Sequence, residues 1–552
     1  MNDTSTPSPL PTRSPRRAGL PLRAWYALGA VALTVLSALA FTAAWVVRRA
    51  EPEARRLVIE TLSDRLHTRV ELDQLHVSLL HGMGGLQVTG SGLRIESIDG
   101  SGRPATSGVP MLTVEGFAFR TSLGTLLHDT PGAIDVFATN AIVTLPAASS
   151  AAQPVKLKPL PGILLVHDVV VTGAKIVFEP AQPGAEPVEY DLREVRLADR
   201  GDGHAFAYTG TVVGAGLIPD VHASGDLGPW LPSSPRDTPI DGSYRFEKGD
   251  LRAIAGLSGT VASTGSFHGT VSQIAAEADV EIPDFALAIS AHPVSLHVHA
   301  QVLVDCATGS AIIASSTTTF LHTSIAATGT VTRAPEGFAV EADKQIQGRS
   351  EDMLVLFSKA RTPVMSGALE YKGHLSVPPG QTNVITRAHA RGVAAIRGAA
   401  WADRAMQQQI DAVSQRAQGK AEVAKGDPRK IPVATSDVTM QVAIDNGVMS
   451  LTHVVDSMPG ASVVMQGTYA LIGGRVDMHG VARTAARASQ LTTGWKSLLL
   501  KPVDPLFSKH GAGAEVPVKM TGDLAHPAFG TDFKNRGEDQ RKTEKIVTVQ
   551  KK

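Results

Sequence analysis

The side chains best placed for chemistry in this chain are two histidines, His297 and His299, in the stretch VSLHVHAQVLV. Side chains two positions apart on a β-strand project from the same face, so the two imidazoles could chelate a metal ion. Solvent-facing polar positions on an alternating strand explain the pair equally well. We therefore expect no metal site at these histidines.

Hydrolytic chemistry is the second class to consider, because the stretches HTSIAATGT and VHASGDL bring histidine close to serine or aspartate. A nucleophilic triad also requires a third group that orients the base and an oxyanion hole, and neither stretch marks one. The chain contains no nucleophile elbow, P-loop, dinucleotide-binding glycine motif or HExxH zinc motif. Cys306 is the only cysteine, which excludes an intrachain disulfide and a CxxC redox pair. We expect neither an enzyme nor a bound cofactor.

The strand that carries the two histidines has an apolar face opposite them. That face is formed by Val294, Leu296, Val298, Ala300, Val302 and Val304. A second stretch, VTMQVAIDNGVMSL, alternates in the same way through Val438, Met440, Val442 and Ile444. Its next residues, Asp445-Asn446-Gly447, predict a tight hairpin turn, because Asn and Gly accept positive φ. Both stretches therefore predict half-buried β-strands with one apolar face.

Alternation of this kind covers most of the chain, so the predicted fold class is mainly β. A short phrase of glycine, then threonine or aspartate, then an apolar residue recurs at irregular spacing, for example as TGTV, SGDL and QGTY. Irregular spacing argues against a solenoid of fixed repeat and favours many similar strands in one long meandering sheet. Two helical interruptions are expected, at 350–360 and at 401–425, the second with Met406, Ile410 and Val413 on one face.

The composition supports strands with small side chains. Glycine is abundant at 52 residues, aromatic residues make up 5% and hydrophobic residues 43%. The 52 basic and 52 acidic residues give no net field, so we expect no nucleic-acid partner. The charged, patternless tail at 534–552 is predicted to be disordered.

The strongest single signal is the uncharged stretch at 24–47. It is long enough to cross the hydrocarbon core of a bilayer as one helix, and Trp25, Tyr26 and Trp45 lie where aromatic belts form. No second apolar run of that length follows. We therefore expect one transmembrane helix, which anchors the chain once.

Arginines flank this span at both ends in nearly equal number, so charge alone does not fix its orientation. A basic cluster before a first apolar segment favours a cytoplasmic tail at 1–23, with the large C-terminal part exported. The ALA at 38–40 could be read as a signal-peptidase site, but the apolar run continues past it without a break. After the span, Val58, Leu62 and Leu66 recur at the spacing of an amphipathic helix.

The C-terminal third carries a dense pattern from Met458 to Phe533. A Pro-Gly-Ala strand, a Gly-Thr-Tyr strand, the segment TTGWKSLLLKPVDPLF and a Gly-Ala-Gly turn follow one another in that order. This order resembles the C-terminal region of AsmA-like proteins, and the stretches at 363–380 and 407–420 resemble it as well. The anchor and GGLQVTGSGLRIES resemble the family's N-terminus more loosely. The resemblance implies an AsmA-like N-terminal region at 48–145, a variable β-rich middle at 146–360 and an AsmA-like C-terminal region at 361–533.

One segment of that region, TTGWKSLLLKPVDPLFSK, is unlike the alternating strands around it. One face of a short helix would be formed by Leu491, Trp495, Leu498 and Leu499, and Pro502 and Pro505 would then stop the helix. One role for this apolar segment is to cap the open edge of the last strands. The other is to contact a membrane surface or a partner, because Trp and Leu beside lysines suit an interface.

AsmA-like proteins are similar in architecture to bridge-like lipid transfer proteins, whose sheets curl into a long groove with an apolar interior. The resemblance implies a transmembrane helix followed by an elongated, curled antiparallel β-sheet with a few short helices. It also implies a bacterial inner-membrane protein with its bulk in the periplasm. The apolar strand faces would either close into a core or line an open groove, and alternation alone does not separate these two.

The implied function is that of a passive conduit or carrier for phospholipids or other acyl lipids in outer-membrane lipid homeostasis. The groove would then be lined by Val294, Leu296, Val298, Val302, Val438, Met440, Val442 and Ile444, with no single essential residue. The alternative is a scaffold that assists assembly of outer-membrane proteins. In that case the sheet is ordinary core, and its edges or the Trp495 segment bind a client in the envelope.

Overall fold

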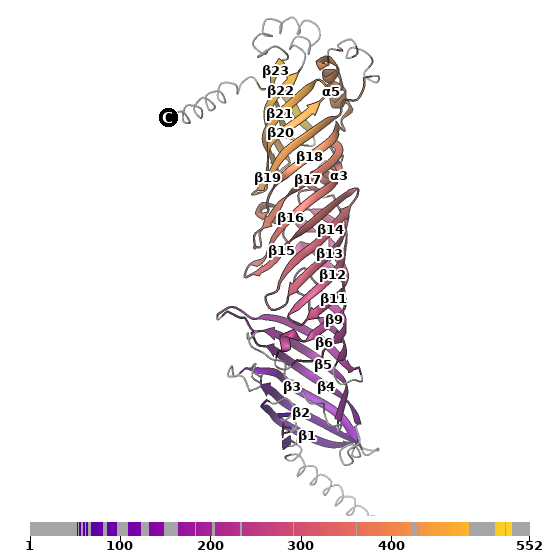
Figure 1. Cartoon of the computed structure of the whole chain (residues 1–552), viewed down its shortest axis with the longest axis vertical. Helices are drawn as coiled ribbons and strands as arrows, with labels where there is room; N and C mark the ends of the chain where they lie inside the picture. The colour runs from indigo at the N-terminus through magenta and orange to yellow at the C-terminus, as the bar shows by residue number, and fades with distance from the viewer. Residues whose placement is uncertain are drawn as a thin grey trace, which may run out of the picture.

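The computed structural model describes most of the chain between residues 52 and 532. The described residues are 52, 55, 56, 59, 60, 62, 63, 68–80, 85–96, 109–122, 132–147, 164–182, 184–200, 205–231, 234–290, 292–359, 362–418, 420, 423, 427, 431–484, 514–524 and 526–532. Over these residues the fold is mainly β, with one large curled sheet and few helices. Figure 1 shows a long rod in which strands cross the axis diagonally, from the indigo N-terminal strands at one end to the yellow C-terminal strands near the other.

The sheet contains 24 strands within the described residues. The first are β1 (Val70–Leu80), β2 (Gly85–Glu96), β3 (Pro110–Ser122), β4 (Gly132–Leu145), β5 (Leu164–Phe178), β6 (Val188–Asp199), β7 (Phe206–Val212) and β8 (Val221–Leu227). The central ones are β9 (Pro239–Asp250), β10 (Leu257–Ser258), β11 (Thr260–Thr270), β12 (Gln273–Leu287), β13 (Val294–Asp305), β14 (Ser310–Phe320), β15 (Thr323–Ala334) and β16 (Gly337–Arg349). The last are β17 (Met365–Val377), β18 (His389–Trp401), β19 (Ser436–Asp445), β20 (Val448–Met458), β21 (Ala461–Ala470), β22 (Arg475–Thr484), β23 (Ala514–Asp523) and β24 (His526–Thr531). Among the described residues, the helices with complete bounds are α3 (Ser350–Phe357), α4 (Val384–Arg387) and α5 (Arg404–Ala417), with single 3-10 turns η1 (Pro235–Asp237) and η2 (Leu251–Ala253).

Neighbours along the chain are neighbours in the sheet, because each strand pairs with the next one. The two-residue β10 is an exception, since it pairs with β12 and leaves β9 to pair with β11. The pairing of β4 with β5 is parallel, with Gly132 opposite Leu164, and the other pairs are antiparallel. At about 4.8 Å per strand the ladder is roughly 100 Å long. It passes without a break through the boundaries predicted after residues 145 and 360.

The two faces of the sheet differ in polarity, because side chains alternate along each strand. One face, called the inner face below, carries a buried hydrophobic cluster that extends from Leu251 to Met478 and includes Leu296, Ile346 and Val438. The opposite, outer face carries exposed polar side chains, as the alternating burial along β13 shows. The core therefore lies along one side of the ladder over most of its length.

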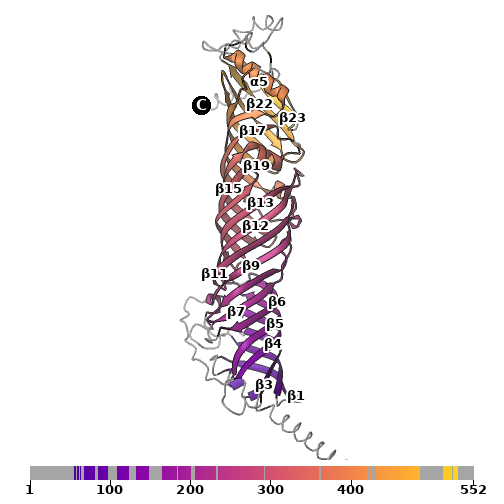
Figure 2. The same cartoon turned by 90° about the vertical axis from the view of Figure 1, so that its right-hand side faces the viewer.

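Contacts between strands that are distant in the ladder show that the sheet curls. The Tyr190 hydroxyl of β6 donates a hydrogen bond of 3.0 Å to the carbonyl of Cys306, which follows β13. Near the C-terminal end, the rings of Trp401 in β18 and Phe529 in β24 meet edge to face with centroids 5.3 Å apart. A flat sheet would hold these pairs several strand spacings apart. Figure 2 shows the strands wrapping around the long axis of the rod.

Two local predictions are confirmed. In the predicted hairpin, Asn446 and Gly447 have φ values of 49° and 73°, and Asp445 pairs with Val448 across the turn. These are the positive φ values that a two-residue turn between antiparallel strands requires. The short helix predicted at 350–360 is α3.

α5 differs from its prediction in length and in the face that it buries. It spans Arg404–Ala417, whereas the sequence predicts a helix at 401–425. The face predicted to pack comprises Met406, Ile410 and Val413. Ile410 is half-buried, and the other two side chains lie outside those that the structure describes.

The described side chains that α5 buries most deeply include the polar Gln407, Asp411 and Ser414. The Gln407 amide donates to Asp411 at 2.7 Å and to the Ala434 carbonyl at 3.0 Å. Asp411 accepts from the Ala434 backbone N–H at 2.7 Å, and Ser414 donates to the Pro459 carbonyl at 2.8 Å. The packing face of α5 is therefore held by hydrogen bonds, which a pattern of apolar residues does not reveal.

Several predictions fall outside the described residues. These are the cytoplasmic tail at 1–23, the transmembrane helix at 24–47, the segment with Leu491, Trp495, Leu498 and Leu499, and the tail at 534–552. In the part of the chain that the structure describes, no helix is both long enough and apolar enough to span a bilayer. Of the amphipathic helix predicted after the anchor, Leu62 packs against the cluster of Val70, Ile95 and Met111.

Candidate functional site: the inner face of the sheet

The eight lining residues predicted on β13 and β19 all lie on the inner face, but they are not equally buried. Val294, Leu296 and Val438 are buried, with 6%, 8% and 7% of their surface exposed. The half-buried members are Val298, Val302, Met440, Val442 and Ile444. Each strand thus buries its inner face near its start and leaves it partly open further along. A closed core would bury every inner position of both strands.

Strand register places inner-face residues in three rows that run along the ladder from β9 to β19. The middle row is Tyr244, Gly265, Ala278, Ala300, Ser316, Ala327, Lys344, Gly373, Gly392 and Val442. One flanking row is Gly242, Phe267, Ala276, Val302, Ile313, Gly329, Ala342, Leu375, Ala390 and Ile444. The other is Phe246, Ser263, Val280, Val298, Thr318, Ile325, Ile346, Tyr371, Ala394 and Met440. Seven of these ten middle-row residues are Gly, Ala or Ser, which project least from a sheet, so this row is the lowest line of the surface except at Tyr244, Lys344 and Val442.

The recurrent glycine phrase marks places where neighbouring strands approach closely. A Cβ added to Gly329 of β15 would lie 2.1 Å from the carbonyl oxygen of Glu341, and one added to Gly467 of β21 would lie 2.1 Å from that of Asp477. Both contacts are with the backbone of the next strand, which cannot move aside as a flexible side chain can. Glycine at these positions therefore permits an approach that any other residue would block.

The two histidines singled out in the sequence are exposed on the outer face of β13. The ring of His299 lies between two carboxylates, with Nδ1 at 2.9 Å from Asp279 and Nε2 at 3.2 Å from Glu277. The hydrogen bond with Asp279 raises the pKa of His299. Within the described residues, no group of three or more His, Cys, Asp or Glu side chains is arranged to hold a metal ion.

Two further outer-face histidines make contacts of the same kind. His374 lies 2.9 Å from Asp343, and His479 lies 2.6 Å from Asp532. These hydrogen bonds raise the pKa of both imidazoles. The outer face is thus stabilised by cross-strand pairs of histidine and carboxylate, which suits a solvated surface.

These raised pKa values predict a small dependence of stability on pH. The folded-state pKa of each histidine lies above the value of about 6.5 in an unfolded chain. The pairs therefore stabilise fully below about pH 6.5, and their contribution is lost as pH rises through the raised values. We expect the wild-type chain to unfold at a lower temperature at about pH 8.5 than at about pH 6, and salt to reduce the difference because the His299 and His374 pairs are exposed. In a variant with His299→Gln, His374→Gln and His479→Gln, the unfolding temperature should depend less steeply on pH, as measured by thermal scans at several pH values. An unchanged pH dependence would contradict the role given to these pairs.

The two histidine-containing stretches considered for hydrolysis do not assemble a catalytic group. In VHASGDL, His222 Nδ1 lies 3.0 Å from the Thr211 hydroxyl. In HTSIAATGT, the His322 backbone N–H donates to Asp352 at 2.8 Å, and its ring lies 3.7 Å from the same carboxylate. Neither imidazole has a described hydrogen bond to a serine.

A compact junction joins β5 and β6 to the turn before β9. Phe178, with 2% of its surface exposed, meets the ring of Tyr190 edge-on at 5.9 Å, and the guanidinium of Arg236 lies 5.5 Å from its centroid. Arg236 also donates to the Leu145 carbonyl at 3.0 Å. Cys306 packs in this cluster, where burial raises its thiol pKa to about 11. These contacts fasten the N-terminal strands to the central ones.

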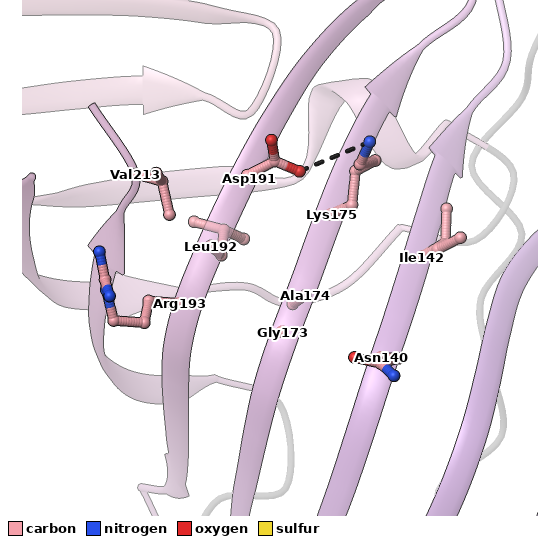
Figure 3. A pocket seen from close by; sticks show the side chains of 9 residues that line it. All are labelled: Asn140, Ile142, Gly173, Ala174, Lys175, Asp191, Leu192, Arg193 and Val213. Carbon is pink, nitrogen blue, oxygen red and sulfur yellow. Dashed lines mark ion pairs between the residues drawn. The ribbon is translucent and has the colours of Figure 1, made fainter. Parts of the chain in front are cut away.

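A cleft of about 490 Å³ lies over β4, β5 and β6, and Figure 3 shows its lining residues. Both cations that line it are already paired. The Lys175 ammonium lies 2.7 Å from Glu189 and 3.5 Å from Asp191, and Arg193 lies 2.7 Å from Asp220. Because these charges are neutralised within the chain, the cleft presents no free cation to a ligand.

The three inner rows contain one charged residue, Lys344 of the middle row. The other members are apolar, small, aromatic or hydroxylated. Comparison with protein-family models, with curated proteins and with solved structures finds no match. What the chain does is therefore inferred from this face. Its chemistry suits contact with hydrocarbon, and its half-buried positions leave that contact accessible.

Proposed function

We propose that this chain is an inner-membrane-anchored periplasmic protein of the AsmA-like group and serves as a passive conduit or carrier for phospholipids or other acyl lipids. The observation that carries the proposal is the run of three inner rows from β9 to β19, which is apolar or small at almost every position and half-buried at most of them. The proposed transmembrane helix at 24–47 would hold one end of the rod at the bilayer.

The energetics of this face favour acyl chains over other ligands. Each methylene group removed from water is stabilised by about 0.8 kcal/mol. A chain that slides along rows of similar apolar residues exchanges one set of contacts for an equivalent one, so no position binds it tightly. Movement of this kind requires no catalytic group on the chain, and we propose none.

Photocrosslinking from single positions tests the proposal. A photoreactive amino acid at Val302, half-buried on the inner face of β13, should form adducts with membrane lipid when the full chain is irradiated in its native membrane. The same amino acid at Gln301, the preceding residue, is exposed on the outer face and should form few. Mass spectrometry of the purified chain measures the yield of lipid adducts at each position. Equal yields at the two positions would contradict the proposal.

The scaffold alternative has one supporting observation. β24 lies at the end of the ladder and, within the described residues, pairs with β23 only, and an edge strand of this kind is a site at which a strand of a client protein would add. A photoreactive amino acid at Phe529 would then crosslink to a β-barrel protein, while Val302 would give no lipid adduct. That pair of results would favour the scaffold over the conduit.

A further inference from the structure

The middle row is interrupted by a lysine at β16. Lys344 stands between Ala342 and Ile346, both buried on the same face of that strand. Its direct partners on the neighbouring strands are Ala327 and Gly373. A long cationic side chain thus rises from a surface of apolar and small residues.

Among the residues that the structure describes, none places a carboxylate near the Lys344 ammonium on the inner face. The acidic residues of its own strand, Glu341 and Asp343, face outward, where both contact His374. The described contact of the Lys344 ammonium is with the ring of Tyr371, at 5.6 Å from the centroid. Burial lowers the pKa of Lys344, which reports the cost of holding a charge here without a counter-ion.

Tyr371 brings a second donor to the same place. A Cβ added to Gly373 would lie 2.3 Å from the Tyr371 hydroxyl oxygen, and one added to Gly392 would lie 2.6 Å from it. Gly373 and Gly392 therefore make room for the phenol to lie over them. In the part of the chain that the structure describes, neither this hydroxyl nor the Lys344 ammonium has an ion-pair or hydrogen-bond partner.

We infer that Lys344 and Tyr371 form a subsite for the acidic group of an anionic lipid, a carboxylate or phosphate carried on an acyl chain. The inference rests on the proposed function. An ammonium and a phenol are both donors, so an oxyanion satisfies both, and charge-assisted hydrogen bonds are stronger than neutral ones. The apolar rows on either side hold the attached hydrocarbon. The subsite makes the conduit selective at β16–β18, where a neutral lipid gains nothing from the lysine.

Matched photoreactive lipids test the subsite in the full chain within its native membranes. The probes are diazirine derivatives of palmitate, of hexadecyl phosphate and of hexadecanol, which supply a carboxylate, a phosphate and a neutral head on single chains of the same length. We expect at least one acidic probe to label the β15–β18 peptides about tenfold more than the alcohol does. The acidic probe with the greater excess identifies the headgroup.

Two variants of similar size separate the subsite from a general effect of charge. Lys344→Met keeps the length of the side chain, breaks no ion pair, and should reduce the labelling by acidic probes to that of the alcohol. Lys372→Met removes a lysine exposed on the outer face of β17 and should leave the preference unchanged. Tyr371→Phe keeps the ring and should reduce the preference in part.

The outcomes distinguish this inference from the function on which it rests. Equal labelling of the wild-type chain by acidic and neutral probes would overturn the subsite while supporting lipid binding. A preference that survives in Lys344→Met would also overturn the subsite. Failure of all three probes to label the inner-face peptides would overturn the proposed function itself.

Discussion

The double substitution Ala300→Trp with Ser316→Trp is expected to reduce the rate of lipid transfer by on the order of tenfold or more. These residues are direct partners in the middle row, on β13 and β14, and both are half-buried. Two indoles would rise from the lowest line of the inner face and displace a passing acyl chain from it. Loss of contact with about two methylene groups, at about 0.8 kcal/mol each, corresponds to about a tenfold change.

The measurement is transfer of a fluorescent phospholipid from vesicles that hold the full chain to acceptor vesicles. The control is Gln301→Trp with Ser315→Trp, which are also direct partners on β13 and β14 but lie exposed on the outer face. The control should transfer at the wild-type rate. If the folded variant with tryptophan at 300 and 316 transfers lipid at the wild-type rate, lipid does not pass along the inner face. The same conclusion follows if both double variants slow the transfer equally.

Phe178→Ala is expected to destabilise the N-terminal strands by about 3–5 kcal/mol, the cost of emptying a fully buried aromatic site. Phe178 supports the ring of Tyr190 and the guanidinium of Arg236, and Arg236 in turn holds the carbonyl of Leu145. Removing the ring leaves a cavity and loosens a buried cation. Because each strand contacts mainly its neighbours in the ladder, the effect should remain local.

Hydrogen exchange followed by mass spectrometry measures this effect by peptide. Peptides of β4–β6 should lose protection in Phe178→Ala, while those of β19–β22 should keep it. The matched control is Phe137→Ala on β4, whose ring is 56% exposed and whose loss should change stability by less than about 0.5 kcal/mol. Uniform loss of protection along the whole ladder would show that the sheet unfolds as one cooperative unit.

The strands and their faces were predictable because side-chain alternation is a local property. In β13 and β19, each residue placed on the apolar face by its sequence position lies on the inner face. The Asn446-Gly447 turn was predictable for a similar reason, since the φ values of a two-residue hairpin select these residue types. Both signals require only a few consecutive residues.

The contact face of α5 was not predictable from the same kind of signal. Apolar spacing favoured Met406, Ile410 and Val413, whereas the structure buries Gln407 and Asp411 with hydrogen bonds to backbone groups. The partner groups belong to residues more than one helical turn away in the chain. A buried polar contact is visible only when both partners are placed.

Local residue patterns are enough to establish that this protein is built from many short alternating strands, each with one apolar side, and that its glycines recur among them. The register between strands is visible only in the folded chain. It aligns Gly265, Ala300 and Gly373 in one row and places Lys344 and Tyr371 within reach of each other. The physical reason is that alternation fixes which side a residue faces, whereas its neighbours across the sheet depend on hydrogen bonds between strands that are separate in the chain. Curling depends further on contacts such as that between Trp401 and Phe529, which no local pattern contains.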